Sequence, residues 1–137
     1  MKKPKSPILT VDGIVQKNGK VLLERRSVKP FLGYWALPGG HVDYGEKVES
    51  AIKREIKEEL GISVRIKKLI GVYSDPERHP WYHTVAVVFL CQKIKGKLSL
   101  SNEVSEFEYF PLNNLPFKIA FDHRKILNDF KRISRKQ

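Results

Sequence analysis

Three glutamates near the middle of the chain are spaced so that they could hold a metal ion. Glu55, Glu58 and Glu59 are three and four residues apart, so in a helix their carboxylates converge. Like charges at this spacing repel, and charges that face a core are costly to desolvate. A hard divalent cation such as Mg²⁺ would offset both costs, because it takes oxygen ligands and keeps positions open for water and phosphate. The spacing therefore predicts a carboxylate metal site, the alternative being a salt-bridged amphipathic helix.

The surrounding residues are typical of an amphipathic helix. Gly45 precedes a run of good helix formers, and Gly61 is a natural C-terminal stop. At about 100° per residue, Glu55 and Glu59 point into the middle of the apolar face, and Glu58 lies at its edge. The apolar face itself recurs at three- and four-residue steps and consists of Val48, Ala51, Ile52, Ile56 and Leu60.

The stretch from Gly40 to Ile62 resembles the Nudix box. That box specifies a Gly, five residues, a Glu, seven residues, Arg-Glu, an aliphatic residue, any residue, Glu-Glu, any residue, a Gly and an aliphatic residue. Every specified position is present here: Gly40, Glu46, Arg54, Glu55, Ile56, Glu58, Glu59, Gly61 and Ile62. So many positions at fixed spacing make a specific signal. The preceding GYWALPGG, ending at Gly40, is also similar to the usual Nudix lead-in.

The resemblance implies a role for each box residue. The metal ligands are Glu55, Glu58 and Glu59 with the Gly40 carbonyl, and the expected ion is Mg²⁺, with Mn²⁺ as the alternative. Arg54 orients the glutamates, and Glu46 supports the loop or a water of the metal ion. Gly39, like Gly40, allows a close approach of the backbone, and Gly61 ends the helix.

The general base is expected either within the box or in a later loop. Glu103 and Glu106 precede or begin the strand-like segment EFEYF, and Glu103 is preferred from its offset to that strand. Glu103 could equally be a solvated loop acid. Glu55 is the rival, because one carboxylate can serve as metal ligand and as base.

Four residues are candidates for contact with the substrate. Arg25 and Arg26 end a predicted strand, so alternation sends one to each face, and the resemblance implies that an arginine near here reaches the phosphates. Arg78 and Trp81 lie in the Pro-rich loop SDPERHPWYH, where they offer donors for oxygen atoms and a stacking face. Solvated arginines, and a tryptophan that caps the sheet edge, are the alternatives.

The order of predicted elements indicates one α/β domain over residues 1–137. The resemblance implies an α/β/α sandwich with a mixed β-sheet, which the order strands, helix, strands, helix also favours. The box helix is expected on one face, and an amphipathic helix spans Ile119 to Ile133. The predicted strands are Ile8–Gln16, Val21–Arg26, Val64–Tyr73, Thr84–Cys91 and Glu106–Phe110, and residues 27–40 are expected to form a loop.

The composition limits location and partners. A net charge of +11 favours polyanionic partners; nucleotides are expected, while nucleic acid is disfavoured but compatible with the charge. The only cysteine, Cys91, permits no intrachain disulfide, so a reducing cytoplasm is expected. No segment reaches the roughly 18 consecutive apolar residues of a membrane span, so no membrane association is expected. A homodimer is compatible with the sequence.

The substrate is inferred from one further segment. Nudix enzymes cleave a nucleoside diphosphate linked to another group, and Gly71 to Phe89 resembles the ADP-ribose pyrophosphatase subgroup, which carries a proline near Pro76. An Asp is commoner in that subgroup where His79 stands. Hydrolysis of ADP-ribose to AMP and ribose 5-phosphate is therefore the first expectation. The alternatives are hydrolysis of nucleoside triphosphates, including oxidised purines, to a monophosphate, and a non-catalytic nucleotide- or RNA-binding module.

Overall fold

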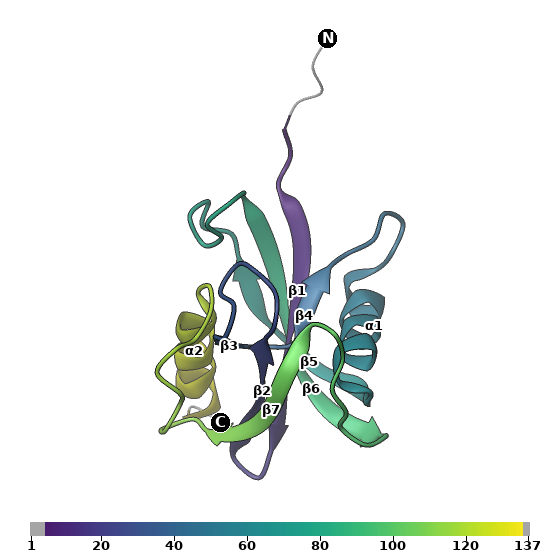
Figure 1. Cartoon of the computed structure of the whole chain (residues 1–137), viewed down its shortest axis with the longest axis vertical. Coiled ribbons are helices and arrows are strands. Elements are labelled where there is room, and N and C mark those ends of the chain that lie inside the picture. Colours follow the sequence, from purple (N-terminus) through teal and green to yellow (C-terminus); the bar gives the residue numbers. More distant parts are fainter. Residues whose placement is uncertain (1–4, 136–137) are drawn as a thin grey trace.

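A computed structural model describes residues 5–135 and contains one mixed sheet between two helices (Figure 1). The strand order is β3-β2-β1-β6-β5, with β4 pairing β1 and β7 pairing β2. Strands β1 and β6 run parallel, and the other pairs are antiparallel. The elements are β1 Ile8–Lys17, β2 Lys20–Arg26, β3 Trp35–Ala36, β4 Gly39–His41, α1 Val48–Leu60, β5 Ser63–Tyr73, β6 Thr84–Lys95, β7 Val104–Pro111 and α2 His123–Arg135.

The two helices cover opposite faces of the sheet, as Figure 1 shows. Alternation along a strand explains this: Leu22 packs in the cluster that contains Ile52 and Ile56 of α1, whereas Leu23 packs in the cluster that contains Phe130 of α2. Each face is therefore apolar and needs its own helix to exclude water. The predicted α/β/α sandwich with a mixed sheet is confirmed.

The turn chemistry in the sequence explains where several elements end. Asn18 and Gly19 both have positive φ (53° and 76°), which suits the tight turn between β1 and β2. Helix α1 ends at Gly61, whose φ is 76° and whose N–H donates to the Lys57 carbonyl at 3.0 Å. The predicted strands are confirmed, and β6, which contains Thr84–Cys91, lies between β1 and β5. The predicted helix start at Ile119 was wrong, because α2 begins at His123 and Ile119 forms a bridge with Trp35.

The segment 27–40 was expected to be a loop, and this was wrong for its second half. It contains the short strands β3 and β4, and β4 pairs with β1 through Val11 opposite Gly40 and Asp12 opposite Gly39. A Cβ atom on Gly39 would lie 2.0 Å from the Val11 carbonyl oxygen, so only glycine permits this approach. Strand β4 thereby places both glycines between β1 and α1.

The structure bears on two features of the composition, the single cysteine and the apolar segments. Cys91 is a buried free thiol, and burial raises its pKa to about 12, which suits an inert core residue. Neither helix in the range 5–135 is both long and apolar enough to cross a membrane. The basic start of the chain lies largely outside the described residues.

Candidate active site

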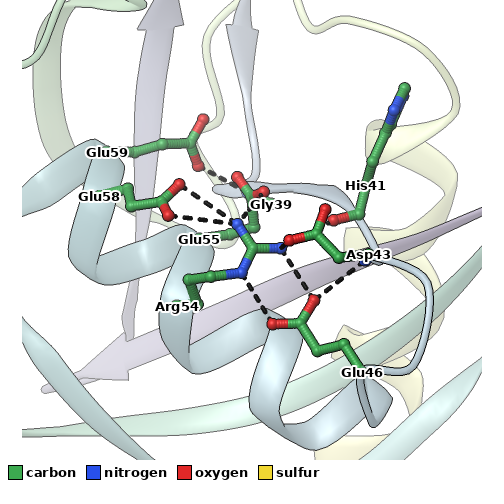
Figure 2. A network of polar contacts seen from close by, with 8 residues as sticks. All are labelled: Gly39, His41, Asp43, Glu46, Arg54, Glu55, Glu58 and Glu59. Atoms are coloured by element: carbon green, nitrogen blue, oxygen red, sulfur yellow. Dashed lines mark hydrogen bonds and ion pairs between the residues drawn. The ribbon is translucent and has the colours of Figure 1, made fainter.

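Arg54 is the centre of a polar network that joins the box helix to the loop before it (Figure 2). Its Nη1 donates to Glu55 Oε1 at 2.9 Å and to both oxygens of Glu58 at 3.2 and 3.3 Å. Its Nε and Nη2 donate to the two oxygens of Glu46 at 2.8 and 2.9 Å, and Nη2 also donates to the His41 carbonyl at 3.0 Å. These bonds place Arg54 where it orients two of the three glutamates.

Glu46 fastens the loop that leads into the helix. Besides the paired bonds from Arg54, its Oε1 accepts the Asp43 N–H at 3.0 Å. These bonds lower the pKa of Glu46 from its usual 4.5 to about 2, the bonds from Arg54 being the largest cause. Glu46 therefore supports the loop, which is one of the two roles expected for it.

The lowered pKa of Glu46 predicts a specific loss of stability in acid. The unfolded chain binds a proton here near pH 4.5 and the folded chain only near pH 2, so this contribution is complete above pH 4.5 and is lost as the pH falls to about 2. We expect the free energy of unfolding to fall less across this window in Glu46→Gln than in the wild type, measured by urea denaturation. The exposed Glu108 supplies the control Glu108→Gln; equal pH slopes in wild type and Glu46→Gln would contradict the assignment.

Glu55 and Glu59 face the core, as their helical spacing predicts. Glu59 is buried and its Oε1 accepts the Gly39 N–H at 3.0 Å, while the Glu55 carboxylate lies against Gly40. Burial raises the pKa of both carboxyls; at Glu55 the bond from Arg54 opposes this rise, whereas at Glu59 a neighbouring carboxyl, Glu24, adds to it. Glu58 is the exposed member, with 57% of its side chain accessible.

The donors at this place suit a hard divalent cation. All are oxygens, and a Cβ atom on Gly40 would lie 2.4 Å from Glu55 Oε2, so carboxylate and backbone share a cradle that a side chain would fill. Within residues 5–135, no three Asp, Glu, His or Cys side chains are already arranged around one point that could hold a metal ion. Glu55 Oε1 and both oxygens of Glu58 accept hydrogen bonds from Arg54, whereas Glu55 Oε2 lies against Gly40.

A cavity of about 180 Å³ opens beside the glycines of β4. Arg26 lines it, whereas Arg25 points to Glu106, with a 2.9 Å ion pair at the exposed surface. The predicted alternation therefore sends only one arginine to the site. Arg26 Nε donates to the Pro30 carbonyl at 2.8 Å, and its guanidinium carbon lies 5.1 Å from the centre of the Phe121 ring.

The loop between β5 and β6 closes one side of this cavity with aromatic side chains. His79 stacks on Tyr82 with ring centres 4.1 Å apart, and on Phe121 at 5.2 Å. Burial, and next the nearby Arg26, lower the pKa of His79, which favours a neutral ring. Trp81 lines the same cavity, is 61% exposed, and lies edge-on to His79 at 5.9 Å. An exposed indole at a cavity rim has a free face for stacking.

Arg78 has a structural position at the base of that loop. Its guanidinium donates to both oxygens of Asp122 at 2.9 and 2.7 Å and to Thr84 Oγ1 at 2.5 Å, and its side chain is only 5% exposed. The Nε, Nη1 and Nη2 atoms of Arg78 each donate to a protein group. The expectation that Arg78 donates to substrate oxygens stays a prediction. What the contacts show is that Arg78 ties the aromatic loop to the start of α2.

Removing Arg78 should therefore destabilise the protein strongly. Arg78→Ala leaves Asp122 largely buried without its partner, and breaking such a pair costs about 3–5 kcal/mol. Chemical denaturation should show this loss, while Arg65→Ala, which removes an exposed arginine bonded to Gln92, should cost under about 1 kcal/mol. Adding Asp122→Asn to Arg78→Ala should restore part of the loss. A loss for Arg78→Ala as small as that for Arg65→Ala would contradict this role.

The two candidate bases differ in their surroundings. Glu106 pairs with Arg25 at the exposed surface. Glu103 precedes the strand, and its backbone carbonyl accepts the Ser27 N–H at 3.0 Å. Its carboxylate is close enough to raise the pKa of Glu55 and of Glu24. The geometry thus favours Glu103 over Glu106.

Four buried or cavity-lining residues were missed from the sequence. His123 Nδ1 accepts the Leu37 N–H at 3.0 Å, and its Nε2 lies 3.6 Å from Asp12 Oδ2, so the pair braces the segment before Gly39. Phe121 and Glu24 also line the cavity. Two signals were available: Asp12 and Glu24 are acids that directly adjoin the apolar runs of their strands.

Comparison with known proteins agrees with this geometry. The NUDIX domain family matches residues 7–130. An ADP-ribose pyrophosphatase of Methanocaldococcus jannaschii is 50% identical over 92% of this chain and 74% of its own. The crystal structure of a MutT NUDIX hydrolase from Burkholderia pseudomallei superposes with a TM-score of 0.84 at 31% identity, over 91% of this chain and 98% of its own. The NUDIX domain of Shewanella oneidensis NrtR, solved in complex with ADP ribose, has a TM-score of 0.80 at 26% identity, over 95% and 90%. The chain belongs to the Nudix family.

Proposed function

We propose that this Nudix hydrolase cleaves the diphosphate linkage of ADP-ribose and releases AMP and ribose 5-phosphate. The observation that carries the proposal is the 50% identity to the Methanocaldococcus jannaschii ADP-ribose pyrophosphatase along almost the whole chain. The cavity supports it, because it brings together the positively charged side chain of Arg26, the glycines beside the glutamates, and aromatic rings. A nucleoside diphosphate sugar needs partners of these kinds for its phosphates and its base.

Glu55, Glu58 and Glu59 would hold the metal ion, with the Gly40 carbonyl as a further ligand. Mg²⁺ is the proposed ion and Mn²⁺ the alternative, since both take oxygen ligands. When bound, the ion neutralises charge on the diphosphate and makes water easier to deprotonate. Arg54 would keep Glu55 and Glu58 oriented toward the ion.

The remaining steps follow from the chain's own residues. Arg26 would bind a phosphate oxygen, and Trp81 would stack on the adenine at the rim. Glu103 would accept the proton of the attacking water, whose oxygen forms the new bond to phosphorus. The bridging phosphorus–oxygen bond then breaks, and its oxygen leaves with the other product. One water is consumed, and one phosphate monoester is formed on each side.

A substrate panel tests the proposed specificity. ADP-ribose, NADH, dinucleoside polyphosphates, nucleotide sugars and nucleoside triphosphates would be compared by kcat/KM with identified products. ADP-ribose should rank first. A higher kcat/KM for a nucleoside triphosphate would instead assign the chain to triphosphate hydrolysis. The cytoplasmic location stays a prediction from composition. The homodimer stays a prediction that is compatible with the sequence, and size-exclusion chromatography with light scattering tests it.

A further inference from the structure

Glu24 lies in the cavity wall and has no role in the steps above. It belongs to β2, is only 3% exposed, and lines the cavity together with Gly39 and Gly40. Among the described residues, its Oε1 has no hydrogen-bond partner. A buried carboxyl oxygen without a partner costs about 1–3 kcal/mol, so an apolar residue here would stabilise the fold better. This cost points to a ligand that meets Glu24.

The surroundings of Glu24 are mainly acidic. Glu59 of α1 faces it and is itself only 7% exposed, and Asp12 of β1 is near enough to raise the pKa of Glu24. Arg26 is the cation that opposes them, but its Nε donates to the Pro30 carbonyl. Two buried carboxyl groups that face each other are therefore incompletely compensated by the protein.

A cation fits this place better than a neutral hydrogen-bond donor of the substrate. A hydroxyl or amino group would satisfy the free oxygen of Glu24 but would not bind Glu59 at the same time. A divalent cation compensates both carboxylates and prefers oxygen ligands. Glu59 is also bonded to Gly39, next to the Gly40 carbonyl, so the inner end of the cavity adjoins the proposed metal ligands.

We propose that Glu24 is a further ligand of the divalent ion, binding it together with Glu59 at the inner end of the cavity. This inference rests on the proposed function, in which the box glutamates hold the ion. It adds a carboxylate from the sheet to ligands that all come from the box. The ion would then be held between β2 and α1, across the face of the sheet that the helix covers.

Mn²⁺ binding to the substrate-free protein tests the proposal without relying on activity. Titration followed by electron paramagnetic resonance should show Glu24→Gln binding Mn²⁺ about 10-fold or more weakly than the wild type. The matched control is Glu108→Gln, the same change on the neighbouring strand, where Glu108 is exposed and pairs in register with Leu23. The control should bind like the wild type.

The outcomes separate this inference from the proposed function. Equal Mn²⁺ affinity in Glu24→Gln and wild type would overturn the role of Glu24 and leave the box glutamates as ligands. No Mn²⁺ binding by the wild type would overturn both. Thermal unfolding without metal checks that Glu24→Gln folds. If it does not fold, Glu24→Asp keeps the charge but shortens the reach toward Glu59, and the same weakening is expected; unchanged affinity there would equally overturn the proposal.

Discussion

Glu59→Gln should lower kcat about 100- to 1,000-fold, and Glu58→Gln should lower it by a similar factor. Loss of a metal ligand removes about 3–4 kcal/mol of charge stabilisation in the transition state, at about 1.36 kcal/mol for each tenfold change in rate. Glutamine has nearly the same shape, so the fold should persist. In the metal-free protein, Glu59→Gln also removes repulsion from Glu24, so its unfolding temperature should not fall.

Steady-state kinetics at saturating Mg²⁺ would measure this effect. Glu49→Gln is the control, because Glu49 is an exposed glutamate in the first turn of the same helix. Turnover near the wild-type value in both Glu58→Gln and Glu59→Gln would refute the metal assignment. Loss in Glu59→Gln alone would leave the exposed Glu58 as a surface residue bonded to Arg54.

Glu103→Gln should be the second large loss, with kcat falling about 100-fold or more. A positioned general base contributes about 10²–10⁴-fold, and glutamine cannot accept the proton. Glu106→Gln is a closely matched control, because it lies three residues away and its carboxylate pairs with Arg25 at the surface. Its kcat should stay within about threefold of the wild type.

The comparison also identifies the base if Glu103 is not it. Equal, small losses in Glu103→Gln and Glu106→Gln would return the role to Glu55, whose raised pKa and contact with Gly40 place it in the site. A normal KM in Glu103→Gln together with a low kcat would show that substrate binding is intact.

Local pattern predicted the box helix and its acids well. Helical spacing alone placed Glu59 in the core and Glu58 at the edge, since 3.6 residues per turn determine which side a residue takes. In the strand, where successive side chains point to opposite faces, alternation separated Arg25 from Arg26. These relations depend only on neighbours along the chain.

Local patterns could not predict contacts between residues that are far apart in the sequence. Arg78 and Asp122 are 44 residues apart, and nothing local to Arg78 indicates that an acid at the start of α2 meets it. The strand β4 was missed because its glycines read as a turn, although β1 supplies its hydrogen bonds. The approach of Glu24 to Glu59 likewise depends on how β2 packs against α1. Such contacts depend on topology, so they become visible only in three dimensions.

The most direct test of the central claim is ³¹P NMR of ADP-ribose incubated with the protein. With Mg²⁺, the diphosphate signals should disappear as two monoester signals of equal intensity grow, matching AMP and ribose 5-phosphate. With excess EDTA, the diphosphate should persist. An intact diphosphate in Mg²⁺ and in Mn²⁺, or equal hydrolysis in EDTA, would contradict the account.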